Sequence, residues 1–171
     1  MKKSLAITCI ILISVITFES LAQQPTLSVA VTGKVKAEKK FSSANLKKFK
    51  LENIADVVIT NHKGETKGTA KGMKGVLLRD VLQDISLDTD NPKLFSEYYY
   101  VCTAADGYKV VYSWNELFNS AVGNSVYIVL EKDQKDLEGS EDSILMISTQ
   151  DTRTGRRYVK NLQTINVGRA Q

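Results

Sequence analysis

The sequence predicts an α+β fold, a mixed β-sheet domain with short helices. Segments with alternating or β-branched residues outnumber segments with helical spacing, and the two kinds are interspersed along the chain. The sequence contains no internal repeat, low-complexity tract or interdomain linker. We therefore expect one domain, and the individual elements are justified below in chain order.

The N-terminal segment has the order of a secretory signal peptide. Lys2 and Lys3 precede an apolar run over residues 5–18, and small residues at 20–22 come before Gln23. The apolar run is shorter than the span of about 20 residues that a membrane-spanning helix needs. We expect residues 1–22 to be removed and residues 23–171 to form a periplasmic or secreted domain without stable membrane insertion.

The charge balance limits the classes of binding partner, and the cysteine content indicates how the domain is stabilised. Removal of residues 1–22 leaves 21 basic and 18 acidic side chains, a small positive excess. Nucleic acids select clustered positive charge, so the composition predicts no nucleic-acid partner. Cys102 becomes the only cysteine, and stability must therefore come from an apolar core rather than from an internal disulfide.

The first elements are a strand and a short helix. Apolar residues alternate with small or polar ones over residues 27–32, which predicts a strand with one buried face. The lysine-rich segment 34–50 follows, and we interpret it as a solvated surface, with an anion-steering patch as the alternative. Ser42 or Ser43 is expected to cap a short helix within it. Residues 54–60 predict the next strand.

Residues 61–64 are typical of a turn, and the glycine- and lysine-rich stretch 64–75 follows it. This stretch lacks the ending of a phosphate-binding loop. A helix is expected next, because residues 78, 81, 82 and 85 are apolar and have the spacing of one helical face.

A β-hairpin is the clearest prediction in the second half of the chain. Residues 98–103 and 108–112 are rich in aromatic and β-branched side chains and flank a short turn. Ser113 and Glu116 then match a capping box, so a short helix should begin at Trp114. The remaining segments predict strands at residues 125–130, 144–148 and 158–167, with an acidic loop at 131–142 and a polar loop at 149–156.

Residues of ordinary catalytic or metal-binding type are sparse. His62 is the only histidine, so the sequence offers no catalytic triad and no zinc-ligand spacing, and we interpret His62 as a turn residue. Cys102 falls in the middle of a predicted strand, where cysteine is usually an inert small apolar residue. We therefore assign no catalytic residue and no metal ligand.

The polar segment 149–160 is the strongest candidate for a binding site. It carries Arg153, Arg156, Arg157 and Lys160, and guanidinium groups bind phosphate or carboxylate through two oxygens at once. Asp151 is expected to orient these cations. A hairpin loop made soluble by arginine is the alternative interpretation.

Three segments in this order resemble the oxidoreductase molybdopterin-binding domain, the fold of sulfite oxidases and periplasmic methionine sulfoxide reductases. They are the Gly-x-x-Leu helix entry at residues 75–82, the hairpin turn at 105–108, and the glycine, arginine and lysine segment at 155–162. The resemblance covers residues 54–167 and implies a sulfite oxidase molybdopterin-binding-like fold. It also implies that the family's arginine and lysine, which hold the pterin phosphate, correspond to Arg157 and Lys160.

Catalytic members of that family bind molybdenum through a cysteine at the end of the strand before the helix entry. Residues 56–74 contain no cysteine, and the matching neighbourhood is the turn at 60–63. Threonine or asparagine cannot replace a soft thiolate ligand. The resemblance thus implies a molybdopterin or another pterin-like anion as the cofactor, without molybdenum.

Three functions follow as hypotheses. The first is a binding module that holds an anionic small molecule through Arg156, Arg157 and Lys160 without redox turnover. The second is a molybdenum-dependent oxidoreductase of the sulfite oxidase type, in which Cys102 or His62 would have to bind the metal. The third is a non-catalytic scaffold that contacts a protein partner through the tyrosines at residues 98–100.

Overall fold

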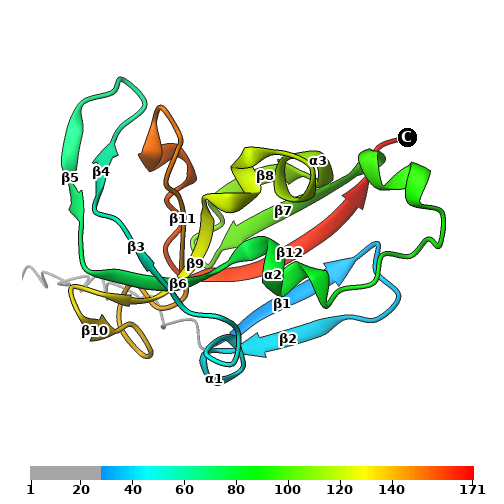
Figure 1. Cartoon of the computed structure of the whole chain (residues 1–171), viewed down its shortest axis with the longest axis horizontal. Coiled ribbons are helices and arrows are strands. Elements are labelled where there is room, and N and C mark those ends of the chain that lie inside the picture. The colour runs from blue at the N-terminus through cyan, green and yellow to red at the C-terminus, as the bar shows by residue number, and fades with distance from the viewer. Residues whose placement is uncertain (1–27) are drawn as a thin grey trace, which may run out of the picture.

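The computed structural model describes residues 28–171, and the proposed signal peptide lies outside the described residues. Two five-stranded sheets and a two-stranded hairpin form the architecture, with short helices at their ends (Figure 1). The first sheet has the order β2-β1-β12-β7-β8 and contains β1 (Ser28–Gly33), β2 (Lys39–Ser42), β7 (Tyr98–Ala104), β8 (Lys109–Ser113) and β12 (Leu162–Arg169). Only the β1–β12 pair is parallel, so the sheet is mixed, as predicted.

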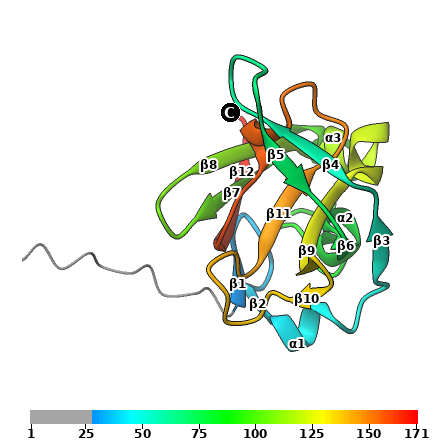
Figure 2. The same ribbon diagram turned by 90° about the vertical axis from the view of Figure 1, so that its left-hand side faces the viewer.

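The second sheet is antiparallel and has the order β10-β9-β6-β3, with β11 also paired to β9. Its strands are β3 (Glu52–Ile54), β6 (Met73–Leu77), β9 (Val126–Lys132), β10 (Lys135–Asp136) and β11 (Leu145–Ser148). The hairpin consists of β4 (Val57–Thr60) and β5 (Thr66–Ala70). Figure 2 shows this hairpin from its own side of the molecule.

Three α-helices and three 3-10 helices lie among residues 28–171, and all are short. The α-helices are α1 (Ser43–Leu46), α2 (Leu78–Gln83) and α3 (Trp114–Phe118), and the 3-10 helices are η1 (Pro92–Glu97), η2 (Ala121–Asn124) and η3 (Thr154–Arg157). The predicted α+β class is therefore confirmed. The helix expected after residue 75 begins at Leu78, and its predicted apolar face, Leu78, Val81 and Leu82, is buried.

The main core lies between the two sheets. Alternate residues of β7 and β12, such as Tyr100, Cys102 and Ile165, pack toward Val76 and Ile128 of the second sheet, together with the buried face of α2. A smaller core lies on the opposite face of the second sheet, beneath the β4–β5 hairpin. Because successive side chains of a strand point to opposite faces, β9 contributes Ile128 to the first core and Val129 to the second.

Two predicted strands differ from the structure. The expected strand at residues 54–60 is divided, because β3 pairs with β6 whereas β4 pairs with β5, and the chain leaves one sheet for the other at residues 55–56. The expected strand at residues 158–167 begins only at Leu162. Before it, η3 and the left-handed backbone of Asn161 (φ 52°) keep the chain irregular, apart from one bridge between Val159 and Met146.

The predicted cap at Ser113 is confirmed and supports a stability prediction. The Ser113 hydroxyl accepts a hydrogen bond from the Glu116 backbone N–H at 3.1 Å, and the Glu116 carboxylate accepts one from the Ser113 N–H at 2.8 Å. Ser113→Ala should therefore lower the free energy of unfolding by about 1 kcal/mol, measured by urea denaturation. Thr152→Ala, at an exposed position, is the control and should change it by less than about 0.5 kcal/mol. Equal midpoints for the two variants would contradict the prediction.

Candidate functional site

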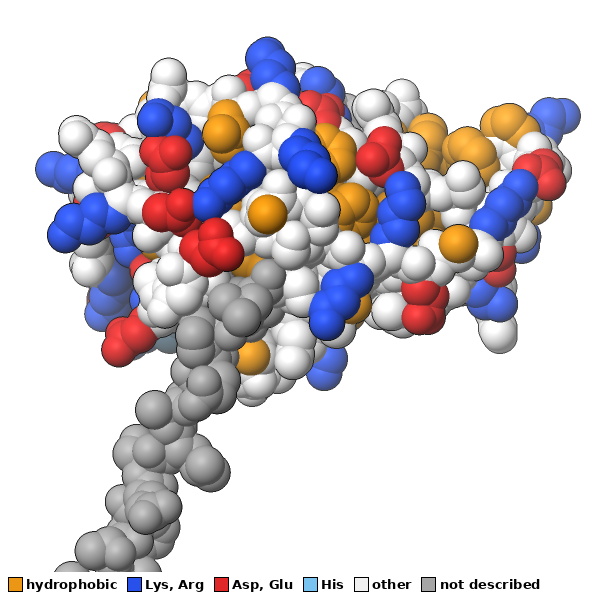
Figure 3. Space-filling model, turned by 90° about the horizontal axis from the view of Figure 1, so that it is seen from below, with side chains coloured by type: hydrophobic (Ala, Val, Ile, Leu, Met, Phe, Trp, Pro, Cys, Tyr) orange, Lys and Arg blue, Asp and Glu red, His pale blue; other side chains and the backbone are white. Residues whose placement is uncertain are grey.

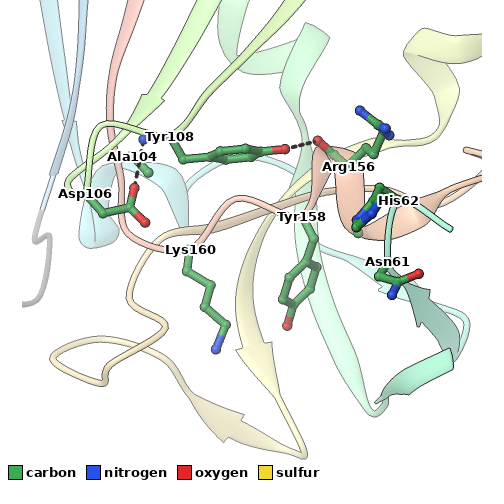
Figure 4. A pocket seen from close by; sticks show the side chains of 9 residues that line it. Asn61, His62, Ala104, Asp106, Tyr108, Arg156, Tyr158 and Lys160 are labelled. Carbon is green, nitrogen blue, oxygen red and sulfur yellow. Dashed lines mark hydrogen bonds between the residues drawn. The ribbon is translucent and has the colours of Figure 1, made fainter. Parts of the chain in front are cut away.

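Three segments that are distant in sequence meet around a cavity of about 430 Å³, which we call the three-segment pocket. They are the turn after β4, the turn of the β7–β8 hairpin, and the chain from η3 to residue 160. The lining residues are Asn61, His62, Ala104, Asp106, Tyr108, Gly155, Arg156, Tyr158 and Lys160. Figure 4 shows their side chains. The volume lies within the range of about 300–1,000 Å³ that is usual for small-molecule sites.

The pocket is held together by contacts between η3 and the end of β4. The Thr154 hydroxyl donates a hydrogen bond to the Val58 carbonyl at 2.6 Å and accepts one from the Thr60 N–H at 3.0 Å. At Gly155 the two backbones are so close that a Cβ atom would lie 2.1 Å from the Thr60 carbonyl oxygen. Figures 1 and 2 both place the β4–β5 hairpin beside η3.

Tyr108 closes the remaining side. Its backbone N–H donates to the Asp106 carboxylate at 2.8 Å, and its hydroxyl donates to the Arg156 carbonyl at 2.6 Å. Figure 4 shows the tyrosine extending from the hairpin turn to η3. The hairpin turn is thus fixed to the arginine segment, and the aromatic ring forms part of the pocket wall.

Arg156 is a cation without a partner in the part of the chain that the structure describes: its guanidinium makes no ion pair or hydrogen bond with residues 28–171. Lys160 is different, because its ammonium group lies 2.7 Å from the Asp142 carboxylate. Asp142 also binds Lys132 at 2.7 Å. Two ammonium groups thus share one carboxylate, and Asp133, Asp136 and Glu141 line the same neighbouring cavity.

The pKa of Asp142 is lowered, and two opposing effects determine it. Burial favours the neutral acid and raises the pKa, but the hydrogen bonds from Lys132 and Lys160 favour the carboxylate and outweigh burial. In Figure 4 the side chains of Lys160 and Tyr158 point to one side of the chain, whereas the Arg156 guanidinium lies at the other end of the pocket near His62. The pocket therefore has a positive group at each end and aromatic rings between them.

Arg157 does not line this pocket. Its guanidinium forms two hydrogen bonds with the Asp151 carboxylate, at 2.6 and 2.5 Å, and a third with Glu116 at 3.2 Å. It also lies 4.4 Å from the centre of the Tyr112 ring. Its pKa is raised chiefly by the hydrogen bond with Asp151, although burial opposes this. Asp151, which was expected to orient the cations of this segment, therefore orients Arg157.

Arg157 and Lys160 were expected to act as a pair, but the structure does not bring them to one cavity. In an extended strand Arg157 and Lys160 would point to opposite faces, so their pairing required a twist or a bulge between them. Instead, the 3-10 turn of η3 directs Arg156 toward the pocket and Arg157 toward Asp151. Anion binding by the predicted residues remains a prediction.

His62 and Cys102 occupy very different environments. His62 lies in a turn, as predicted, and lines the three-segment pocket beside Asn61. Cys102 is fully buried in β7, and burial raises the pKa of its thiol to about 12. The thiolate that a soft metal would need is therefore strongly disfavoured. Residues 28–171 contain no group of three His, Cys, Asp or Glu side chains arranged to hold a metal ion.

The lysine-rich segment is largely neutralised by ion pairs. Lys36 pairs with Asp90, Lys47 with Asp136 and Glu138, and Lys50 with Glu52. Figure 3 shows basic and acidic side chains interspersed on the face seen from below. The arrangement favours the solvated surface over an anion-steering patch. In the described part of the chain, no helix has the length and apolar character needed to cross a membrane.

The fold has a counterpart among solved structures. The chain is similar to the sulfane dehydrogenase SoxCD from Paracoccus pantotrophus, with a TM-score of 0.58 and 13% sequence identity, over 86% of this chain. It spans only 39% of the length of that protein chain. No protein family and no curated protein matches the sequence. The likeness shows a shared fold, and the structure has the α+β architecture, with mixed sheets and short helices, that the sequence predicts.

Of the residues that line the pocket, only Arg156 and Lys160 were predicted as site residues, and Tyr108 and Asn61 are among those that were not. Both lie in segments that were singled out from the sequence, the hairpin turn and the turn at the position of the family's cysteine. The sequence did not indicate that these two turns lie beside the arginine segment in the folded protein.

Proposed function

We propose that the protein binds an anionic small molecule of the phosphorylated pterin class in the three-segment pocket, without redox turnover. One observation carries this proposal. The pocket unites the segment 155–160 and the hairpin turn, which belong to two of the three segments that resemble a molybdopterin-binding domain, with the turn at 61–62, where that family would have its cysteine. The segments lie far apart in the chain, so their convergence was not implied by any one motif.

The lining supplies the groups that such a ligand requires. Arg156 offers a guanidinium without a partner among residues 28–171, and Lys160 adds positive charge at the other end. The rings of Tyr108 and Tyr158 provide apolar faces for a planar heterocycle. The Asp106 carboxylate can accept hydrogen bonds from its polar edge, whereas the Asn61 amide already accepts from the Lys63 and Glu65 N–H groups and donates to the Glu65 carboxylate.

The donor set does not fit molybdenum ligation by the family's thiolate. Thr60, Asn61 and His62 occupy the neighbourhood where the family places its cysteine, and Cys102 is buried in the core. The Thr60 hydroxyl is itself buried without a hydrogen-bond partner among the described residues. A hydroxyl is a hard ligand and cannot replace a soft thiolate. We therefore derive no step through the metal and propose a binding function.

Calorimetric titration with neopterin monophosphate, and with unphosphorylated neopterin as the matched probe, tests the proposal. Arg156→Gln should weaken binding of the phosphorylated probe by about tenfold, because a charge-assisted hydrogen bond contributes about 1.5 kcal/mol or more. Lys160→Gln should weaken it less, because Lys160 lies at the other end of the pocket and is paired with Asp142. Lys40→Gln, at an exposed lysine that does not line the pocket, is the control and should leave the affinity unchanged.

Three outcomes would contradict the proposal. Equal affinity for both pterins, or no binding by the parent protein, would favour a scaffold that contacts a protein partner. Elemental analysis after expression in a host that makes the molybdenum cofactor supplies the second test. About one molybdenum per chain would favour the oxidoreductase instead.

A further inference from the structure

A second cavity of about 390 Å³ lies between η1, the start of α3, β7 and residues 82–90, and we call it the aromatic pocket. It shares no lining residue with the three-segment pocket. Its wall includes Phe95, Tyr100, Trp114 and Phe118, with Leu82 and Ile85 beside them. The rest of the lining is mostly polar and comprises Lys36, Gln83, Ser86, Leu87, Thr89 and Asp90, so the pocket has one aromatic wall and one polar wall.

Three of these rings form a continuous surface that solvent can reach. The centroid of Trp114 lies 5.4 Å from that of Phe118, with the rings stacked at 28°, and 5.4 Å from that of Phe95. Phe95, Trp114 and Phe118 are all partly exposed rather than buried. Their geometry is that of stable aromatic pairs, so the surface is preformed and can bind another ring.

Tyr100 contributes the polar group of the pocket. The residue is only 2% exposed, yet its hydroxyl makes no hydrogen bond with residues 28–171. Tyr98, two residues earlier on the same face of β7, shows the usual arrangement, because its hydroxyl donates to Asp88. Unlike the buried Tyr112 hydroxyl, which has no partner among the described residues, the Tyr100 hydroxyl oxygen reaches the surface of the cavity. At the wall of a cavity, an unpaired donor of this kind can bind an acceptor on a ligand.

The charges at the pocket are already balanced. Lys36 and Asp90 both line it, and they form an ion pair with each other. A charged ligand would gain little from this pair. The lining therefore favours a neutral molecule.

We propose that the aromatic pocket is a second binding site, for a small neutral aromatic molecule that carries a hydrogen-bond acceptor. The ligand ring packs against Trp114 and its neighbours, and the acceptor receives the hydrogen bond of the Tyr100 hydroxyl. This proposal is independent of the function assigned to the three-segment pocket.

Trp114 is the only tryptophan, so its fluorescence reports on this pocket alone. Benzamide combines a ring with a carbonyl acceptor, and toluene is the matched probe without an acceptor. We expect benzamide to change the tryptophan emission in a saturable manner. Tyr100→Phe should weaken benzamide binding by about three- to tenfold and leave toluene binding unchanged, since it removes only the hydroxyl.

Tyr99→Phe is the control, because Tyr99 is exposed and does not line the pocket. It should leave the binding of both probes unaltered. The urea midpoint of Tyr100→Phe should be no lower than that of the parent, because the hydroxyl has no partner to lose, and this separates binding from folding. A linear emission change that never saturates, or equal benzamide affinity in Tyr100→Phe and the parent, would overturn the proposal.

Discussion

Arg157→Ala is expected to lower the free energy of unfolding by about 2–4 kcal/mol, although an arginine in a polar segment would usually tolerate replacement. The side chain is only 21% exposed, and Asp151, its main partner, is 15% exposed. Removing the guanidinium leaves a buried carboxylate without its counter-ion, which costs more than the loss of a surface ion pair. Urea denaturation followed by circular dichroism measures the change.

Arg156→Ala is the matched control, because the neighbouring guanidinium has no internal partner in the described chain. It should change the free energy of unfolding by less than about 0.5 kcal/mol. The Arg157→Ala and Asp151→Ala changes should not be additive, since both remove the same pair of hydrogen bonds. Similar stability for the two arginine variants would show that the Asp151 contact contributes little.

The contrast between these two arginines shows which features of the segment could be predicted from the sequence. The segment was identifiable as a concentration of cations, and Asp151 was identifiable as a partner because it lies six residues from Arg157. Glu116 was not, because it is 41 residues away and belongs to the cap of α3. Which of two adjacent arginines is structural depends on such distant partners.

The same distinction applies to the elements of the fold. The α3 cap and the β7–β8 hairpin depend on residues that are close to each other in the sequence, and both were predicted correctly. The division of residues 54–60 into β3 and β4 depends on which distant strand each half meets, β6 or β5. The spacing of apolar residues does not indicate which distant strand each half pairs with. The irregular chain before β12 was missed for a similar reason, because η3 is held by contacts with β4.

Predicting the candidate site requires both local motifs and contacts between segments that are distant in the sequence. Resemblance to a known domain singled out the arginine segment and the turn at 60–63 separately. Only the structure shows that Thr154 and Gly155 bring the two into contact and that Tyr108 completes the wall. That contact is the part of the site most open to a direct test.

Gly155→Ala is expected to lower the free energy of unfolding by about 1–3 kcal/mol and to weaken binding of neopterin monophosphate by at least as much as Arg156→Gln. The added methyl group would lie 2.1 Å from the Thr60 carbonyl oxygen. A backbone atom cannot move aside as a flexible side chain can, so η3 must shift away from the end of β4. Because Arg156 and Asn61 lie on either side of this contact, the shift separates two walls of the pocket.

Gly75→Ala provides a control with the same steric conflict in another place. A Cβ atom at Gly75 would lie 2.3 Å from the Ile128 carbonyl oxygen, between β6 and β9, and Gly75 does not line the pocket. Both variants should be destabilised to a similar extent in urea. Titration of the folded proteins should show weakened binding for Gly155→Ala and parental affinity for Gly75→Ala. Equal affinities would mean that the close approach of η3 to β4 stabilises the fold without shaping the site.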